Sequence, residues 1–130
     1  MEDSIFTKII KGEIPAHKIY EDENTLAFLD IHPSTTGHTL VIPKKQVDHL
    51  WDLEDPDYQA VMATAKLVAN RLKEVLGVQR VGVKVVGTDV PHAHVQLIPF
   101  NTPDEFHAPQ NLNSEPDHTV LATLAQRLQF

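Results

Sequence analysis

The sequence predicts an α+β protein with a five-stranded antiparallel sheet, a short N-terminal helix and one long helix. Its 130 residues suit a single domain with a hydrophobic core. Five short runs of strand-forming residues are mostly joined by short turns, and one long segment repeats apolar residues at helical spacing. Because the helical segments lie apart from the strands, an antiparallel sheet is expected.

The first predicted element is a short helix that ends near Ile10. Asp3 or Ser4 can cap its N-terminus with a side-chain oxygen, and Gly12 can end it. Apolar residues fall at helical spacing within it, at Ile5, Phe6, Ile9 and Ile10.

Three strands are expected to follow this helix. The first two lie at residues 17–21 and 25–30, and the polar residues 22–24 between them form a plausible hairpin turn. The third strand is residues 38–42, which Pro43 ends because proline cannot donate to a sheet.

The long helix is predicted over residues 57–76. Pro56 fits its first turn and Gly77 fits its C-terminal end. Apolar side chains repeat along one face, at Tyr58, Val61, Met62, Ala65, Val68, Ala69, Leu72, Val75 and Leu76.

Two further strands are expected at residues 80–86 and 92–99. Residues 101–117 are rich in proline and in Asn, Asp and Ser, so they are predicted to form turns and irregular chain. A last helix is expected at about residues 118–128.

Composition excludes several classes of function. Eleven Lys and Arg against 18 Asp and Glu give a net charge of −7 without a basic cluster. This argues against binding of polymeric nucleic acid or of an anionic membrane. The absence of cysteine excludes a disulfide scaffold, a thiolate metal site and a cysteine nucleophile. The acidic N-terminus and the lack of a long apolar run predict a cytoplasmic protein.

The most informative segment is residues 91–99, PHAHVQLIP. Side chains alternate between the two faces of a strand, so His92, His94 and Gln96 are expected on one face. The apolar residues between them are expected to point into the core.

Three interpretations of this polar face remain open. It can be an ordinary solvated face of a sheet. It can hold a metal, although zinc prefers four ligands and Gln96 is a poor one. It can also perform nucleophilic catalysis on phosphorus, with His94 attacking, Gln96 donating from its amide, and the turn of Gly87, Thr88 and Asp89 supplying backbone N–H groups.

The segment resembles the signature of the histidine triad (HIT) family, His-x-His-x-His followed by apolar residues. Two further blocks match in the same order: residues 4–15 resemble the N-terminal helix of the family, and residues 27–31 with 37–45 resemble its ribose-binding block. The resemblance covers about residues 3–100. It implies a HIT-like domain at residues 1–100 and a C-terminal extension, residues 101–130, packed on the same domain.

The resemblance also implies a function. HIT proteins form homodimers whose sheets join, and each subunit binds a purine nucleotide with its α-phosphate at the motif. By this analogy His94 is the nucleophile, His92 orients it, and His38 relays a proton. Asp30 would bind the ribose, and five apolar residues would hold the base: Phe6, Ile9, Ile14, Phe28 and Ile31.

The sequence departs from the family pattern in three ways. Gln96 stands at the third triad position, as in the nucleotidyltransferase branch, and glutamine cannot act as a general acid. The loop before the motif lacks the asparagine that is frequent there, so its phosphate contacts are open, and Lys84 is a possible compensating group. Ser4 and Thr7 replace the cysteines that bind zinc in many relatives, so no metal and no cofactor are expected.

These observations predict a nucleotide hydrolase or nucleotidyltransferase that forms a nucleotidyl-His94 intermediate. Its substrate would be a dinucleoside polyphosphate or a nucleoside phosphoramidate. Two alternatives stay open: a nucleotide-binding or adaptor protein with little catalytic activity, and a metal-dependent hydrolase.

Overall fold

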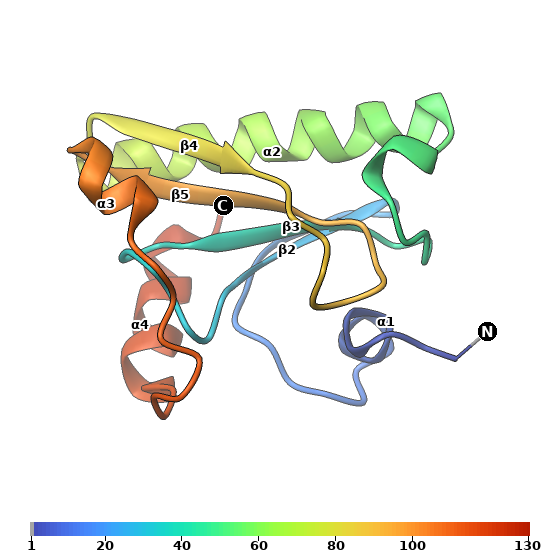
Figure 1. Cartoon of the computed structure of the whole chain (residues 1–130), viewed down its shortest axis with the longest axis horizontal. Coiled ribbons are helices and arrows are strands. Elements are labelled where there is room, and N and C mark those ends of the chain that lie inside the picture. Colours follow the sequence, from blue (N-terminus) through green and yellow to red (C-terminus); the bar gives the residue numbers. More distant parts are fainter. Residues whose placement is uncertain (1) are drawn as a thin grey trace.

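The structure is a computed structural model of the chain and describes residues 2–130. Five strands form one antiparallel sheet in the order β1-β2-β3-β5-β4 (Figure 1). The predicted α+β class and the five-stranded sheet are therefore confirmed. The elements are α1 (Ile5–Ile10), β1 (Lys18–Glu21), β2 (Thr25–Leu29), β3 (Thr39–Pro43), α2 (Asp55–Leu76), β4 (Arg80–Lys84), β5 (Val95–Phe100), α3 (Pro103–His107) and α4 (His118–Leu128), with a 3-10 turn at Leu50–Asp52.

Helices cover both faces of the sheet (Figure 1). The long helix α2 and the C-terminal helix α4 pack on one face, where they bury the larger part of the core. The short helix α1 packs on the opposite face through Phe6 and Ile9, against Phe28 and Leu40. Because α1 is much shorter than the sheet is wide, it leaves part of this second face uncovered.

Local sequence explains where several elements begin and end. The Ser4 hydroxyl accepts a hydrogen bond from the Thr7 N–H at 3.0 Å, so Ser4 caps α1. The Asp22 carboxylate accepts N–H bonds from Asn24 and Thr25 at 2.8 Å each, which forms the expected turn between β1 and β2. Gly77 ends α2 in the left-handed conformation, with φ 68°.

Two predictions need correction. The strand expected from residue 92 begins at Val95, because the N–H groups of His92 and Ala93 bond outside the ladder, to Val90 O at 2.8 Å and Val47 O at 2.7 Å. Residues 101–117 are not wholly irregular. They contain α3, whose start carries a capping box, with the Glu105 carboxylate accepting from the Thr102 N–H at 2.9 Å.

The other predicted elements differ from the structure only at their ends. The helix predicted over residues 118–128 is α4, with the same bounds, and α2 begins two residues before the predicted start. No helix among residues 2–130 combines the length and the apolar character that crossing a membrane requires.

Candidate active site

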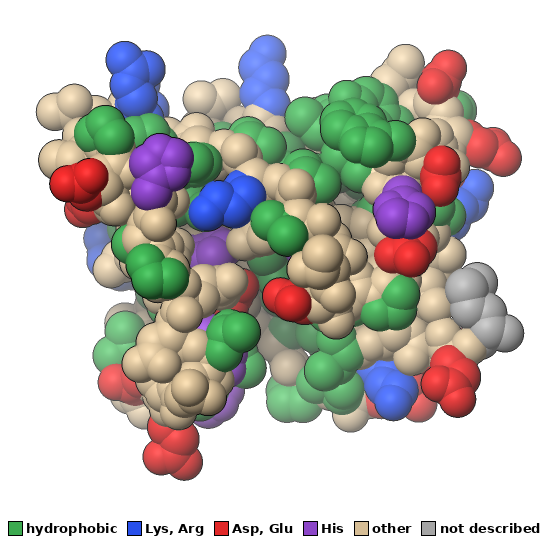
Figure 2. All heavy atoms as spheres, in the orientation of Figure 1, with side chains coloured by type: hydrophobic (Ala, Val, Ile, Leu, Met, Phe, Trp, Pro, Cys, Tyr) green, Lys and Arg blue, Asp and Glu red, His purple; other side chains and the backbone are tan. Residues whose placement is uncertain are grey.

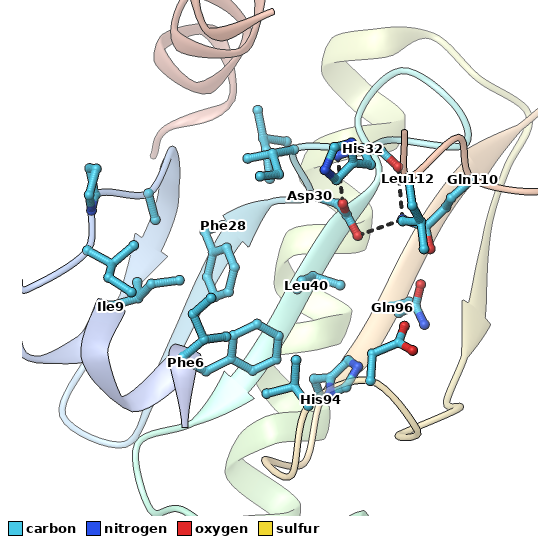
Figure 3. Close-up of a pocket in the computed structure, with 18 residues that line it drawn as sticks. Phe6, Ile9, Phe28, Asp30, His32, Leu40, His94, Gln96, Gln110 and Leu112 are labelled. Atoms are coloured by element: carbon cyan, nitrogen blue, oxygen red, sulfur yellow. Dashed lines mark hydrogen bonds between the residues drawn. The ribbon is translucent and has the colours of Figure 1, made fainter. Parts of the chain in front are cut away.

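A cavity of about 290 Å³ opens on the sheet face that α1 leaves partly uncovered (Figure 3). Its walls come from α1, β2, β3, β5 and the segment after α3. The apolar part is lined by Phe6, Ile9, Ile14, Phe28, Ile31, Leu40 and Leu112. The polar part is lined by Asp30, His32, Asp89, His94, Gln96 and Gln110. An apolar pocket with a few converging polar groups is the usual form of a small-molecule site.

His94 lies at the cavity wall with one ring nitrogen fixed. Its Nδ1 lies 2.8 Å from the carbonyl oxygen of His92. Because a carbonyl oxygen only accepts hydrogen bonds, Nδ1 carries the proton and Nε2 carries the free lone pair. His94 is 7% exposed, and its ring lies nearly perpendicular to the Phe6 ring at a centroid distance of 5.2 Å. The imidazole is therefore held in the tautomer that a nucleophile at Nε2 requires.

His92 does not share this wall, contrary to the expected alternation of faces. Its side chain is fully buried beneath the site, where Nε2–H donates to Pro43 O at 2.8 Å and Nδ1 accepts from the Ser4 hydroxyl at 2.8 Å. Gln46 braces this contact by accepting from the Ser4 N–H at 2.7 Å and from the Thr7 hydroxyl at 2.6 Å. Burial lowers the pKa of His92, so the ring is neutral at pH 7.

His38 holds Gln96 in one orientation. His38 Nδ1 accepts from the Ser34 N–H at 3.1 Å, so its proton is on Nε2, which donates to Gln96 Oε1 at 2.9 Å. Burial lowers the pKa of His38, which keeps this neutral tautomer at pH 7. The Gln96 amide nitrogen has no hydrogen-bond acceptor among the described residues and is left to donate toward the cavity.

Asp30 lies at the opposite side of the cavity from α1 and is held by the C-terminal segment (Figure 3). Its Oδ1 accepts from the His32 N–H at 2.8 Å, and its Oδ2 accepts from Gln110 Nε2 at 2.9 Å. Gln110 also donates to the His32 carbonyl at 2.8 Å. Sequence reasoning missed Gln110, because a glutamine in a proline-rich segment belongs to no motif or periodic pattern.

The turn before the motif contributes less to the cavity than expected. Asp89 lines it, whereas Gly87 and Thr88 do not. Gly87, with φ 78°, instead lines a smaller hollow on another side of His94, next to the exposed Trp51. The structure therefore brings together His94, Gln96 and Asp89 at the main cavity, whereas Gly87 and Thr88 of the turn do not line it.

The described residues offer no set of metal ligands. Within residues 2–130, no three His, Asp or Glu side chains converge closely enough to hold a metal ion. The polar groups that line the cavity are the imidazoles of His32 and His94, the amides of Gln96 and Gln110, and the carboxylates of Asp30 and Asp89.

The fold and the site together define a class of α+β proteins that hold a His-x-His pair directly before an inner strand of the sheet, beside an apolar cavity. The model of one family, the HIT domain, matches residues 11–102. The chain therefore belongs to the HIT family, as its motif predicts.

Several curated proteins are similar along most of the chain. An uncharacterized HIT-like protein of Borreliella burgdorferi is 40% identical, over 82% of this chain and 81% of that protein. Protein hit of Bacillus subtilis is 34% identical, over 98% of this chain and 95% of that protein. Adenosine 5′-monophosphoramidase HNT1 of Saccharomyces cerevisiae is 41% identical, over 73% of this chain and 61% of that protein.

Solved structures share the whole fold. A HIT-like protein from Bartonella henselae superposes with a TM-score of 0.83 at 28% identity, covering 98% of this chain and 95% of that one. A member of the HIT family from Bacillus subtilis superposes with a TM-score of 0.76 at 31% identity, with 99% of both chains covered. The similarity therefore extends through the C-terminal segment that carries Gln110.

Proposed function

We propose that this protein is a nucleotide hydrolase or nucleotidyltransferase that acts at the α-phosphate of a purine nucleotide conjugate. The conjugate is of the dinucleoside polyphosphate or nucleoside phosphoramidate type. The observation that carries the proposal is the free lone pair of His94 Nε2 at the wall of an apolar cavity, next to the Gln96 amide nitrogen, which has no acceptor among the described residues. The name of the yeast relative, an adenosine 5′-monophosphoramidase, supports the same reaction class.

The first step is attack by His94 Nε2 on the α-phosphorus. The Nε2–P bond forms, the bond from phosphorus to the leaving group breaks, and the leaving group departs with that electron pair. Positive charge develops on the imidazole and is stabilised by the His92 carbonyl at Nδ1. The Gln96 amide donates to a nonbridging phosphoryl oxygen. Attack by water or by a second acceptor then breaks the Nε2–P bond and frees His94.

The lining of the rest of the cavity supports a site for the nucleoside. Phe6, Phe28 and Leu40 present apolar surface to a purine ring, as do Ile9 and Ile14. Asp30 is the carboxylate available to accept hydrogen bonds from the ribose hydroxyls. Its orientation is fixed on one side by the His32 N–H and on the other by Gln110.

The covalent intermediate provides the test. The protein is incubated with diadenosine tetraphosphate or with adenosine 5′-phosphoramidate, and its intact mass is measured at neutral pH. We expect a mass increase of one adenylyl group in the wild type and none in His94→Ala, while the exposed-site control His49→Ala behaves as wild type. If the wild type shows neither adduct nor turnover, or if His94→Ala matches it, the proposal is wrong.

A second candidate function is nucleotide binding without useful catalysis. It is favoured by Gln96, since an amide cannot protonate a leaving group. Calorimetry with AMP and GMP separates the two candidates, because binding without turnover supports this one. Turnover gained in Gln96→His would show that the missing proton donor limits catalysis.

We further propose a homodimer in which the edge strand β4 joins its copy in a second subunit. The outer edge of β4 pairs with no strand among the described residues, and Val83 on this strand is 52% exposed. Sedimentation equilibrium is expected to give twice the chain mass of 14.6 kDa. Val83→Glu is expected to shift the protein toward the monomer, whereas a wild-type monomer at micromolar concentration would contradict the proposal.

A further inference from the structure

A row of four side chains crosses the sheet on the face that carries the cavity. In the register of the strands, Phe28 of β2 lies opposite Leu40 of β3, Leu40 opposite Gln96 of β5, and Gln96 opposite Lys84 of β4. Directly opposed residues point to the same face of a sheet and lie within contact distance. Each step spans about 4.8 Å, so the row runs from apolar side chains, through an amide, to an ammonium group over about 14 Å.

A second cavity of about 210 Å³ lies at the Lys84 end of this row. It shares Asp89, Gln96 and Gln110 with the first cavity, so the two cavities adjoin at these residues. Its remaining wall combines apolar residues with polar ones, and the polar ones include Lys84, Ser34 and His107. On the face seen in Figure 2, a blue cationic side chain lies between purple histidine side chains over the region of β4 and α3.

Lys84 is a cation with no carboxylate partner. None of the ion pairs among residues 2–130 includes it, although five of the other Lys and Arg residues form one. Its Nζ lies 5.1 Å from the centroid of the Phe106 ring, which packs where a side chain at Gly82 would collide with it. Lys84 is thereby held next to Gln96 and its charge is not neutralised. Among the described residues that line this cavity, Asp89 is the one with an acidic side chain, and it is exposed, so water screens its charge.

We infer that the second cavity is the leaving-group subsite and that it takes an anionic phosphate group, with Lys84 as the residue that selects it. This inference rests on the proposed function. It narrows the substrate to a nucleotide whose α-phosphate is joined to the leaving group through a phosphoanhydride bond. His94 Nε2 bonds to the α-phosphorus, the P–O bond to the next phosphate breaks, and its electron pair remains on the departing phosphate oxygen. That anion needs no proton, so Gln96 suffices where an amine leaving group would require an acid.

Turnover of two substrates with different leaving groups tests whether Lys84 selects an anionic leaving group. The kcat/KM for diadenosine tetraphosphate and for adenosine 5′-phosphoramidate is measured in the wild type, Lys84→Gln, Lys84→Arg and Lys66→Gln. Lys66 lies exposed on α2, so its substitution makes the same charge change away from the site. We expect Lys84→Gln to lower kcat/KM for the polyphosphate by about tenfold or more, the scale of one charge-assisted hydrogen bond. In Lys84→Gln, kcat/KM for the phosphoramidate should stay within about twofold of the wild-type value. Lys84→Arg should retain most of the preference for the polyphosphate over the phosphoramidate.

Binding gives a readout that does not depend on catalysis. ADP carries one phosphate more than AMP, so the wild type is expected to bind ADP more tightly, and Lys84→Gln is expected to lose this difference while keeping its affinity for AMP. The inference is overturned if Lys84→Gln changes both substrates, or both nucleotides, to the same extent, or behaves as Lys66→Gln does. Absence of turnover and adduct in the wild type, together with a Lys84-dependent preference for ADP, would instead contradict the proposed reaction and leave the subsite supported.

Discussion

His38 and Gln96 are joined by a hydrogen bond of 2.9 Å between Nε2 and Oε1, and this bond fixes which end of the amide faces the cavity. The Ser34 N–H occupies the other ring nitrogen of His38, so the ring donates to Gln96 and the amide oxygen is the acceptor. The amide nitrogen of Gln96 is then the end that remains for a ligand. In the proposed reaction, this nitrogen donates to a phosphoryl oxygen.

The first prediction concerns the charge at this position. Gln96→Glu keeps an oxygen for His38 but removes the donor and places a negative charge next to the phosphate. We expect kcat/KM to fall by about 10²- to 10³-fold, the usual cost of losing one donor to a developing anion. Steady-state kinetics measure the change, with the exposed-site variant Gln79→Glu as the matched control. Activity of Gln96→Glu within twofold of wild type would contradict the assigned role.

The second prediction concerns pH and stability. Burial lowers the pKa values of His38, His92 and His17, and His17 also lies 2.9 Å from His118. The unfolded chain titrates these groups near pH 6.5, so below that pH it binds more protons than the native state does. These histidines should therefore contribute their full share to the free energy of unfolding above about pH 6.5. The free energy of unfolding should decrease as the pH falls below this value.

Urea unfolding at pH 7.5, 6.5 and 5.5 measures this effect. The exposed-site variant His49→Gln should retain the decrease, and His17→Gln should make it smaller. An unfolding free energy that stays constant from pH 7.5 to 5.5 would rule out this explanation.

The third prediction concerns Ser4, which joins the start of α1 to His92. Ser4→Ala removes both the helix cap and the donor to His92 Nδ1. We expect a loss of about 1–3 kcal/mol in the free energy of unfolding. Ser114→Ala removes an exposed hydroxyl bond and should change it by less than about 0.5 kcal/mol. Equal effects of the two substitutions in urea unfolding would show that the buried bond contributes little.

The fourth prediction concerns Gln110 and the segment that it holds. Gln110→Glu places a carboxylate against Asp30, and the two like charges repel each other. We expect faster amide hydrogen exchange in residues 108–112 and weaker AMP binding, since Asp30 loses its fixed orientation. Gln129→Glu, in the exposed C-terminal tail, is the control. Unchanged exchange in Gln110→Glu would mean that other contacts hold the segment.

Much of the fold could be predicted because its signals are local. The apolar spacing of α2, the cap at Ser4 and the turn at Asp22 each depend on residues a few positions apart. The short helix α3 was missed because its prolines and polar residues suggest a loop, although Thr102 and Glu105 form a capping box.

The site was predicted less completely because its contacts are distant in sequence. His94 and Gln96 could be identified from the motif, but the burial of His92 depends on Pro43 and Ser4, which no strand alternation reveals. The pairing of Gln96 with Lys84 requires knowing that β4 lies at the edge next to β5. Gln110 reaches Asp30 across 80 positions of sequence, beyond any local pattern.

The row from Phe28 to Lys84 takes one side chain from each of four strands, and this has a consequence for how such a protein can diversify. In the proposed complex, each strand contacts one chemical position along the ligand, while the pairing of the strands holds the spacing constant. If the proposed complex forms, we expect a substitution at the edge strand to change which group is released without altering the base pocket, and a substitution at Phe28 to change the base that is bound without altering the reacting centre. Selectivity for the base and selectivity for the leaving group could then be changed separately, by substitutions on different strands.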